Sequence, residues 1–281
     1  MAVDTSAGVL APPSPDQRHK AIIFEEVSIA FEGRTVLDAI SFELVRGETK
    51  VLLGVAGSGK STILKLVLGL IRADSGRIFV MGHEVTAMTE QQLFDLRRHI
   101  GMVFQESALF DSLTVRENVA YRLREDHDLA EDEVERRVAE ALRFVELEKT
   151  LDLFPSELSG GMRRRVAIAR AIVTQPEIIL YDSPTAGLDP ITSTTIIELL
   201  LKERDVYKTS ALMVTHRLQD AWVMATHRFN RDQNHMEPLE AGAVHDLRTT
   251  FVILREGKVI FDGTAAELAA SQDPYIKEYV A

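Results

Sequence analysis

The chain has 281 residues, of which 46% are hydrophobic and 27% charged, enough for one large α/β domain with a substantial core. The absence of cysteine excludes disulfides, thiolate metal sites and a cysteine nucleophile, and the formal net charge of −11 argues against nucleic-acid binding through a broad positive field. No apolar run approaches the roughly 18 to 20 residues that span a bilayer, so we expect a cytosolic protein.

The first part of the chain predicts an arm, two strands and a strand–helix unit. Residues 1–20 are rich in proline and small side chains, which indicates a disordered arm, and they lack the basic start and apolar stretch of a secretory signal. Residues 21–24 and 39–44 predict strands. Residues 50–53 predict a short apolar strand that leads into a glycine-rich loop, and the apolar spacing over 62–71 predicts a helix.

The rest of the chain alternates between strand and helix patterns, with two interruptions. Between Glu125 and Lys149, acidic side chains outnumber basic ones while valine and leucine recur at helical spacing, so we expect an amphipathic helix with a solvated charged face. The polar segment 230–250 is expected to be a surface insertion. A metal site there lacks a close histidine pair, so we expect solvated loop residues for the histidines in or beside the segment, which are His227, His235 and His245.

The residues from Gly54 to Ser61 match the pattern G-x-x-x-x-G-K-[ST] in full, between a predicted strand and a predicted helix. Glycines in such a loop let successive backbone N–H groups converge on phosphate oxygens at the positive end of a helix. Lys60 would bridge the β- and γ-phosphates, and the Ser61 hydroxyl would bind Mg²⁺. The pattern predicts binding of a nucleoside triphosphate with Mg²⁺, and the residues expected to hold it are Gly54, Ala56, Gly57, Ser58, Gly59, Lys60, Ser61 and Thr62.

Two further segments suit a phosphate site. The apolar strand pattern over 178–181 ends in Asp182, a carboxylate that can hold Mg²⁺ through water. The run Leu158-Ser159-Gly160-Gly161-Met162 precedes a long helical pattern and predicts a helix N-terminus that can receive an anionic oxygen. Three arginines follow, from Arg163 to Arg165, and such a cluster usually forms a solvated helix face.

In this order, the motifs resemble those of the nucleotide-binding subunits of ATP-binding-cassette (ABC) transporters, and the resemblance covers residues 21–268. It implies an α/β fold with a P-loop NTPase core around a mainly parallel sheet, an N-terminal antiparallel β subdomain and an inserted helical subdomain. The helical subdomain is expected at 85–158, the insertion at 230–250 and a C-terminal tail at 269–281.

In that family two subunits enclose two ATP molecules, and the resemblance carries roles over to matching residues. The signature residues Ser159, Gly160 and Gly161 would contact the γ-phosphate bound by the partner subunit. Gln105 would sense Mg²⁺, with Ser61 and Asp182 as the other ligands, and would link the site to the membrane partner. Asp189 would lie in the dimer-contact loop, His216 would act as the switch beside the γ-phosphate, and Phe31 would stack on adenine.

Ser183 stands where the family has a glutamate that polarises the attacking water. A serine hydroxyl cannot act as a base near neutral pH, and loss of a positioned base costs about 10² to 10⁴ in rate. Three explanations stay open: slow hydrolysis with water oriented by His216 and Gln105, pairing with a different subunit that supplies a competent site, and a substituted version that traps ATP. We expect ATP hydrolysis, and the catalytic candidates are Ser183, His216, Gln105 and Lys60.

Within the family, the segment 107–120 after Gln105 resembles that of the Mla/Mce-type lipid-transport ATPases. Met162 in the signature, the run 189–192 and the C-terminal segment 273–279 point the same way. The resemblance implies a homodimeric ATPase, peripheral on the cytoplasmic face of a bacterial inner membrane. It would work beneath a permease that carries phospholipid or another hydrophobic substrate between membranes.

The resemblance also implies partners. The coupling helix of the permease is expected to dock near Gln105 to Val115, and the C-terminal tail to contact a partner or the second subunit. Mce-type substrate-binding subunits and small cytoplasmic subunits are further expected partners, whereas nucleic acid is not. Alternatives are an ATP clamp that hydrolyses little because of Ser183, an importer of another solute, and an ABC ATPase of chromosome or division machinery, which the lack of a long coiled-coil insertion disfavours.

Overall fold

The computed structural model of the chain describes residues 19–125, 129–239 and 248–280. The N-terminal arm expected over 1–20 lies outside the described residues except for its last two positions, and so do His245 and the last residue of the tail. Within the described ranges, no helix is both long and apolar enough to cross a membrane.

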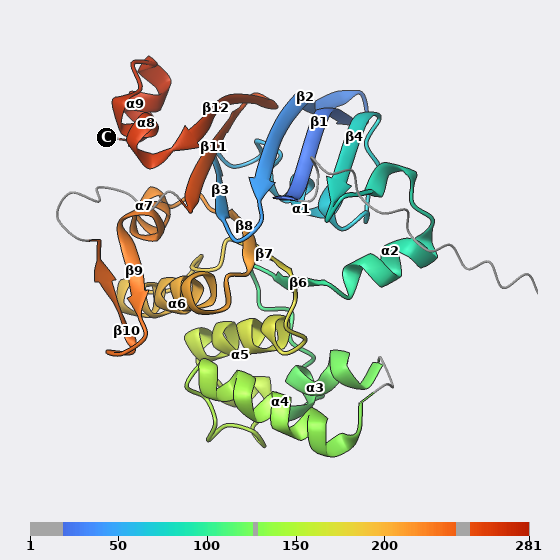
Figure 1. Cartoon of the computed structure of the whole chain (residues 1–281), viewed down its shortest axis with the longest axis vertical. Helices are drawn as coiled ribbons and strands as arrows, with labels where there is room; N and C mark the ends of the chain where they lie inside the picture. Colours follow the sequence, from blue (N-terminus) through green and yellow to red (C-terminus); the bar gives the residue numbers. More distant parts are fainter. Residues whose placement is uncertain (1–18, 126–128, 240–247, 281) are drawn as a thin grey trace, which may run out of the picture.

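Six strands form the central sheet in the middle of Figure 1. In the order in which they pair, they are β12 (Lys258–Thr264), β11 (Thr249–Arg255), β3 (Thr49–Gly54), β8 (Ser210–Val214), β7 (Ile178–Asp182) and β6 (Ile100–Val103). All neighbours are parallel except β12, which is antiparallel to β11. Every residue of β3 is buried, since both faces of the sheet are covered. The expected mainly parallel sheet is confirmed.

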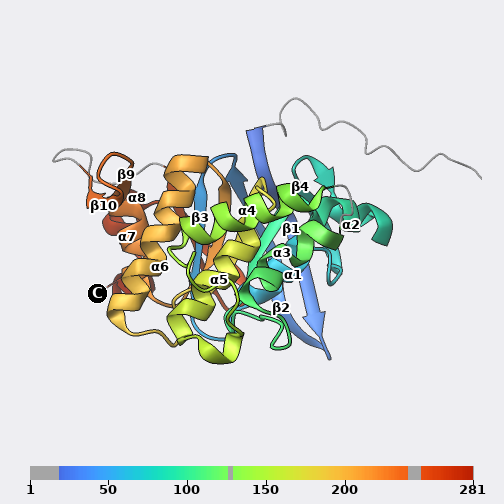
Figure 2. The ribbon, with the colours of Figure 1, turned by 90° about the horizontal axis from the view of Figure 1, so that it is seen from below.

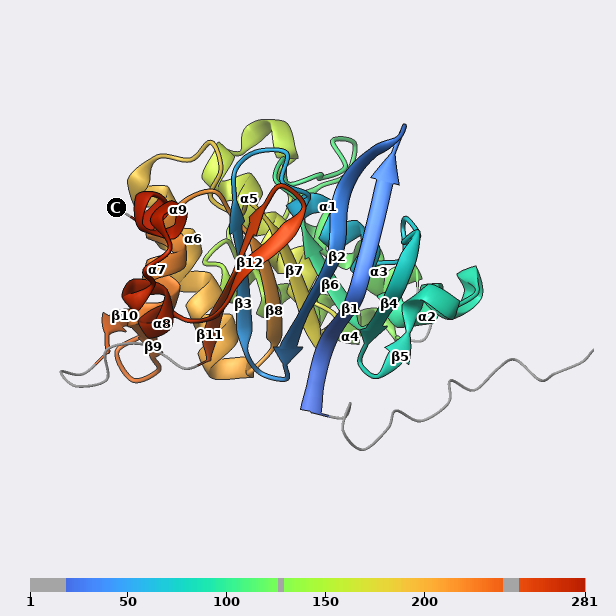
Figure 3. The ribbon, with the colours of Figure 1, turned by 90° about the horizontal axis from the view of Figure 1, so that it is seen from above.

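The N-terminal strands form a second, antiparallel sheet, as expected. Its strands pair in the order β2 (Arg34–Val45), β1 (Lys20–Phe31), β4 (Ser75–Val80) and β5 (His83–Glu84). This sheet shares one hydrophobic core with helix α1 (Lys60–Val67), and β2 lies beside β12 of the central sheet (Figure 3). At this junction the Asp38 N–H donates to the Gly257 carbonyl at 2.9 Å.

Strands β1 and β2 are much longer than the strands predicted over 21–24 and 39–44. Their pairing register shifts on both sides of Val27, and Glu26 and Ala39 have φ angles of 49° and 48°. Such bulges interrupt the two-residue alternation that marks a strand in a sequence. The alternating pattern therefore ends before the strand does.

The helices cover the sheets and form a separate lobe. In chain order they are α2 (Glu90–Arg97), α3 (Val115–Glu125), α4 (Glu131–Phe144), α5 (Gly160–Ile172), α6 (Pro190–Lys202), α7 (Leu218–Thr226), α8 (Ala265–Ala270) and α9 (Pro274–Val280), with short 3-10 turns at 85–87 and 155–157 and a π-helical turn at 203–207. Helices α3, α4 and α5 pack on one another as a helical lobe (Figures 1 and 2). Within the range 85–158 expected for this lobe, β6 belongs to the central sheet.

Helix α4 lies in the acidic segment and is amphipathic, as expected. Val138 and Leu142 are fully buried, whereas Glu133 pairs at the surface with Arg136 and Arg137, each at 2.7 Å. The apolar stripe of α4 belongs to the same core as α5 and the central sheet, so it anchors the lobe to the rest of the domain.

The insertion expected over 230–250 begins within a hairpin formed by β9 (His227–Asn230) and β10 (His235–Pro238). The hairpin packs along α6, where the Met236 N–H donates to the Glu198 carboxylate at 2.7 Å. Residues 240–247 of the expected insertion lie outside the described ranges.

The C-terminal helices lie beside β11 and β12 (Figure 3). Leu268 of α8 and Ile276 of α9 are buried in the main core. The Arg255 guanidinium lies over the Tyr275 ring at 4.4 Å. The tail expected over 269–281 is thus docked on its own domain along its described part.

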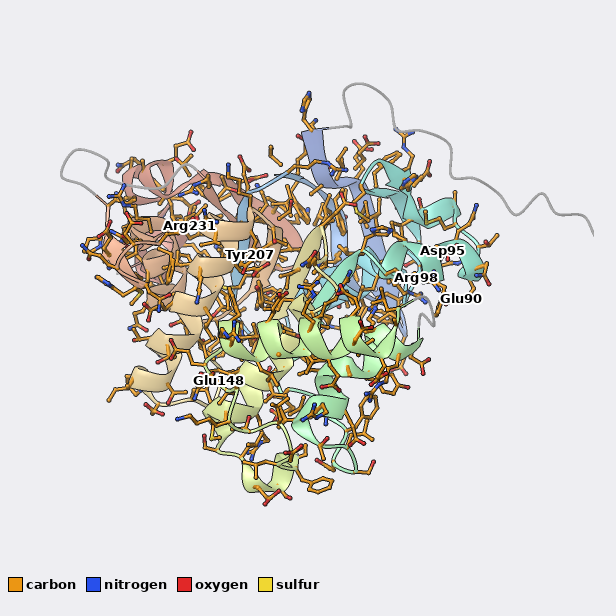
Figure 4. The ribbon with its side chains drawn as sticks, turned by 60° about the horizontal axis from the view of Figure 1, so that its bottom comes forward. Glu90, Asp95, Arg98, Glu148, Tyr207 and Arg231 are labelled. Carbon is orange, nitrogen blue, oxygen red and sulfur yellow. The ribbon has the colours of Figure 1, made fainter. Side chains whose placement is uncertain are left out.

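The π-helical turn after α6 places the carboxylate of Glu203 in the wall of a cavity of about 730 Å³ between α4, α5 and α6. The Thr209 hydroxyl donates to this carboxylate at 2.8 Å. Burial nevertheless raises the pKa of Glu203 to about 7. The outer wall includes Tyr207, which contacts the Phe144 ring and lies near Arg231 (Figure 4).

We expect Glu203→Gln to stabilise the protein above neutral pH by up to ~3 kcal/mol, because the buried charge is removed and the amide still accepts from Thr209. The pKa of Glu203 is about 7 in the folded protein and 4.5 in the unfolded chain. The contribution of the wild-type carboxyl to the free energy of unfolding is therefore complete below pH 4.5 and is lost as pH rises through 7. The gain from the substitution should therefore grow between pH 5 and 7.5 and then level off. Urea unfolding at several pH values measures it, with the exposed Glu148→Gln as control; a gain independent of pH would contradict the assignment.

Candidate nucleotide site

Four of the predicted site segments lie at the edge of the central sheet where the parallel strands end. The phosphate loop follows β3, Gln105 follows β6, Asp182 ends β7 just before Ser183, and His216 follows β8. Because β3, β8, β7 and β6 are parallel neighbours, their carboxyl ends lie side by side. This is the edge at which open parallel sheets bind their ligands.

The Lys60 side chain lies inside the phosphate loop, and the residue is only 8% exposed. Its ammonium donates to the carbonyls of Gly54 and Val55, each at 2.8 Å, and to the Ser58 hydroxyl at 3.2 Å. Burial lowers the pKa of Lys60, and the charge of Asp182 acts in the opposite direction. The loop therefore holds its cation with neutral acceptors, which an anionic phosphate can replace.

Two glycines of the loop are required by the close approach of other strands. Gly59 has a φ of 95°, and a Cβ there would lie 2.5 Å from the Leu37 side chain. A Cβ on Gly54 would lie 2.5 Å from the Leu254 carbonyl oxygen. The loop is thus wedged between β2 and β11. Of the remaining predicted phosphate-binding residues, Ser58 is buried, Thr62 is half-buried, and the exposed ones are Ala56, Gly57 and Ser61.

Ser183 follows β7 with a φ of 48°, and it is 7% exposed. Its N–H donates to the Val214 carbonyl at 2.9 Å, and its hydroxyl donates to the Asp182 carboxylate at 3.3 Å. A hydroxyl that donates its proton to a neighbouring carboxylate presents no base to water. Residue 183 therefore lies at the sheet edge without supplying a carboxylate.

A network of hydrogen bonds and an ion pair connects the chain after β7 to the loop that contains His216. The Thr185 hydroxyl donates to the buried Asp220 carboxylate. Arg217 pairs with Asp220 at 3.5 Å and donates to the Ser193 hydroxyl at 2.9 Å. The network therefore connects the backbone after β7 to the backbone after β8. His216 takes no part in it and is exposed.

The signature begins helix α5 on the lobe, where the Ser159 hydroxyl caps the helix. Gly161 approaches Thr192 of α6 so closely that a Cβ would overlap the threonine methyl group. Asp189 caps α6, and the hydrogen bonds from Thr192 lower its pKa. The signature and the loop of Asp189 therefore form one continuous surface, on which Ser159 and Gly160 are exposed.

Phe31, predicted to stack on adenine, is 45% exposed and lies at the end of β1. The next two residues, Glu32 and Gly33, have φ angles of 51° and 77°, as a two-residue hairpin turn requires. The same hairpin packs on the phosphate loop through Leu37 and Gly59. Phe31 therefore projects from a strand pair that is anchored to the loop.

Two arginines of α5 that the sequence analysis did not assign to the site hold the loop after Gln105. Arg164 donates to the Gln105 carbonyl, and Arg170 donates to the carbonyls of Ser107 and Ala108 at 2.9 and 2.7 Å. The expectation of a solvated arginine cluster is wrong for Arg164, which is buried. A helical-wheel reading could have placed it inside, because it shares a face with the buried residues Ala167, Ile168 and Ala171.

The oxygen atoms at this edge suit Mg²⁺. The Ser61 hydroxyl, the Gln105 side-chain carbonyl and the Asp182 carboxylate are hard ligands of the kind that Mg²⁺ takes. No group of three or more histidine or acidic side chains is arranged to hold a metal within the described ranges. Mg²⁺ bound through few protein oxygens and the phosphates of its ligand needs no such group.

The chain is similar to known proteins along most of its length. Residues 37–186 match the family model described as ABC transporter. Protein TRIGALACTOSYLDIACYLGLYCEROL 3, chloroplastic, of Arabidopsis thaliana is 35% identical over 263 residues, covering 90% of this chain and 71% of that protein. The intermembrane phospholipid transport system ATP-binding protein MlaF of Escherichia coli is 32% identical over 255 residues, 91% of this chain and 86% of that protein. The methionine import ATP-binding protein MetN of Bifidobacterium longum is 34% identical over 246 residues, 87% of this chain but 55% of that protein.

Solved structures are similar in three dimensions. The dimeric structure of an ATP-binding cassette in a post-hydrolysis state, bound to ADP and Pi, matches with a TM-score of 0.71 and 28% identity, over 86% of this chain and 98% of that one. The structure of cbiO1 from Clostridium perfringens, part of an ABC transporter complex, matches with a TM-score of 0.76 and 28% identity, over 90% of this chain and 92% of that one.

Replacing Lys60 by alanine is expected to weaken the binding of Mg²⁺–ATP by a factor of about 30 to 100, because it removes the buried cation from the loop and with it a charge-assisted hydrogen bond. Titration with a fluorescent ATP analogue measures the affinity. Lys65→Ala is the control, since it removes an exposed lysine from the same helix and should leave affinity unchanged. Equal affinities of the wild type and Lys60→Ala would refute the phosphate-site assignment.

Proposed function

Because the chain belongs to the ABC transporter family, we propose that it is the ATPase subunit of a transporter that moves phospholipid or another hydrophobic substrate between membranes. The observation that carries the proposal is the similarity, over 91% of the chain, to a protein named for an intermembrane phospholipid transport system. The name of the Arabidopsis relative also refers to a glycerolipid. ATP binding and hydrolysis are the shared activity of the family.

In this proposal the sheet edge binds ATP. Lys60 and the loop amides orient the β- and γ-phosphates, and the exposed Phe31 ring stacks on adenine. Ser61, Gln105 and Asp182 hold Mg²⁺, which when bound neutralises charge on the phosphates. The buried position of Lys60 supports this assignment, since its ammonium already lies inside the loop.

We infer that a second copy of the chain completes each site. Ser159 and Gly160 are exposed at the N-terminus of α5, where free backbone N–H groups and the helix dipole favour an anionic oxygen. With Gly161 they would contact the γ-phosphate of ATP held by the other copy, and Asp189 would lie at the contact between the copies. The likeness to a dimeric cassette supports this arrangement.

Hydrolysis in this proposal proceeds without a carboxylate at residue 183. Phosphoryl transfer depends mainly on positioning and on stabilisation of charge, which Lys60 provides. Gln105 and His216 orient the attacking water. Slow hydrolysis is preferred over ATP trapping or dependence on a different subunit, because the loops around Ser183 are braced by hydrogen bonds as a working site needs.

We infer that the coupling helix of the permease docks on the segment from Gln105 to Val115. The buried Asn118 amide shapes this segment by donating to three of its backbone carbonyls at 2.9 to 3.0 Å. The Phe110 ring lies against the Tyr121 ring with centroids 4.7 Å apart, and both rings are exposed. A rigid segment with exposed aromatic rings suits the end of a helix from a partner.

The similarity to the phospholipid transport protein also suggests the location and the partners of the chain. We place the chain on the cytoplasmic face of a bacterial inner membrane, as a peripheral homodimer. The tail at 269–281 would contact a partner or the second subunit, and Mce-type and small cytoplasmic subunits would complete the assembly. The domain limits predicted from the sequence, a lobe at 85–158 and an insertion at 230–250, differ from the structure, in which β6 and residues 249–250 belong to the central sheet and α5 belongs to the lobe.

A second candidate is an importer of a small solute. It is favoured by the 34% identity to a methionine import protein. The chain spans 55% of the length of that relative, against 86% of the phospholipid transport relative. The similarity to the phospholipid transport protein therefore covers more of both chains, which favours phospholipid transport over solute import.

The substrate can be tested with the purified complex of this chain and its permease in lipid vesicles. We expect ATP-dependent transfer of a fluorescent phospholipid between vesicles, reduced to the level without ATP in the Lys60→Ala complex because that variant cannot bind ATP tightly. Turnover that rises with methionine or another polar solute, with no phospholipid transfer, would favour the importer instead.

Turnover of the wild-type complex is expected to rise about tenfold or more in Ser183→Glu, because the glutamate supplies the missing base. ATP affinity should change little, as residue 183 does not form the phosphate loop. Steady-state phosphate release measures turnover, and Ser183→Gln is the control that adds length without a base. Equal turnover of the glutamate and glutamine variants would contradict this role for residue 183.

A further inference from the structure

Arg164 differs from its two arginine neighbours at the start of α5. Arg163 is exposed and Arg165 half-buried, whereas Arg164 is 5% exposed. Its guanidinium donates to three backbone carbonyls, those of Gln105, Ser183 (3.1 Å) and Ala186 (3.4 Å). Its remaining nitrogen, Nε, has no hydrogen-bond partner within the described part of the chain.

The three carbonyls belong to loops that are distant in sequence. Gln105 follows β6, Ser183 follows β7, and Ala186 lies in the turn that leads to Asp189. Burial lowers the pKa of Arg164, and the charges of Glu106 and Asp182 act against that shift. Because burying a guanidinium costs free energy unless its donors are used, this position favours the arrangement in which all three loops meet.

A second arginine fixes the far side of the same loop. Arg170 holds Ser107 and Ala108, whose φ angles of 64° and 48° are uncommon for residues with a side chain. The backbone on both sides of Glu106 is thus bound to α5, and through Arg164 it is also bound to the end of β7. Arg164 is the member of the pair that reaches the residues after Asp182.

We propose that Arg164 is a positioning residue for ATP hydrolysis, which holds the backbone of Gln105 against the end of β7 so that Gln105 and Asp182 keep the spacing that a shared Mg²⁺ requires. This role of Arg164 rests on the proposed function, since it assumes that Mg²⁺–ATP binds at this edge of the sheet. A planar guanidinium with five donors can serve three carbonyls at once, whereas a lysine ammonium is a compact point charge. The role is therefore specific to arginine.

The test uses Arg164→Gln and Arg164→Lys in the full chain, with Arg165→Gln as the matched control. Arg165 lies on the same helix and donates to the Val145 carbonyl at 3.1 Å, outside the site. Binding of a fluorescent ATP analogue is titrated without Mg²⁺ and then as a function of Mg²⁺ concentration, so that the main result does not depend on turnover. Turnover, KM and thermal stability are measured on the same samples.

We expect Arg164→Gln to bind the analogue without Mg²⁺ within about twofold of the wild type, because the phosphate loop is untouched. The Mg²⁺ concentration for half-maximal enhancement of binding should rise about fivefold or more, and kcat should fall about tenfold with KM little changed, as expected for a misplaced ligand. Arg164→Lys should recover only part of the Mg²⁺ response. Arg165→Gln should retain the wild-type response.

A merely structural role would lower the thermal stability of Arg164→Gln and Arg165→Gln alike and leave the Mg²⁺ response of both unchanged, and this result would overturn the proposal. If Arg164→Gln does not fold, a wild-type Mg²⁺ response in Arg164→Lys overturns it equally. A wild-type chain that binds no ATP, with or without Mg²⁺, would instead refute the proposed function. The two failures are therefore distinguishable.

Discussion

The parallel pairing of β3, β8, β7 and β6 is the constraint on which the rest of the site depends. Neighbouring strands lie about 4.8 Å apart, so that groups placed just after adjacent strands can share one ligand. The helices between the strands cannot alter this spacing without breaking the hydrogen bonds between the strands. The phosphate loop, Asp182 and Gln105 are consequently brought together by backbone hydrogen bonds rather than by direct contact of their side chains.

Main-chain carbonyls hold the cations around this edge. Lys60 donates to the carbonyls of its own loop, and Arg164 and Arg170 donate to carbonyls of the loops opposite. Such acceptors orient a cation without cancelling its charge, so the edge keeps its attraction for a triphosphate. With serine at residue 183 the edge also has one negative charge fewer than a glutamate would give. In the proposed function, this serine would thus favour retention of the bound anion and leave the site without the base that would speed hydrolysis.

Helix α5 connects the functions assigned to different surfaces. Its N-terminus carries the signature that is proposed to face a second subunit, and its arginines hold the loop on which the permease is proposed to dock. Gly161 packs against the first turn of α6, which Asp189 caps. The segment proposed to receive the permease is therefore connected through α5 to the surface proposed for the dimer contact and, by the hydrogen bonds of Arg164, to the end of β7. Relatives named for phospholipid and for methionine transport align with this chain along most of its length, as expected when the motor is shared and the cargo is selected by other subunits.

The sequence by itself determined the phosphate loop, the order of the motifs and the departure at Ser183, because each depends on residues close together in the chain. The mainly parallel sheet with its antiparallel companion was implied by the resemblance of these motifs to the ABC family, since its strands pair over long distances in the chain. The tertiary structure decided the lengths of β1 and β2, because bulges interrupt the alternation by which a strand is predicted. It also decided the burial of Arg164, which lies in a cluster of arginines expected to be solvated. It also decided the raised pKa of Glu203, which follows from burial between three helices. Arg164 bonds a carbonyl 59 positions away in the sequence. Helical spacing can indicate that Arg164 faces inward, but the carbonyls that it contacts depend on how the sheet and the lobe pack together, which local spacing does not determine.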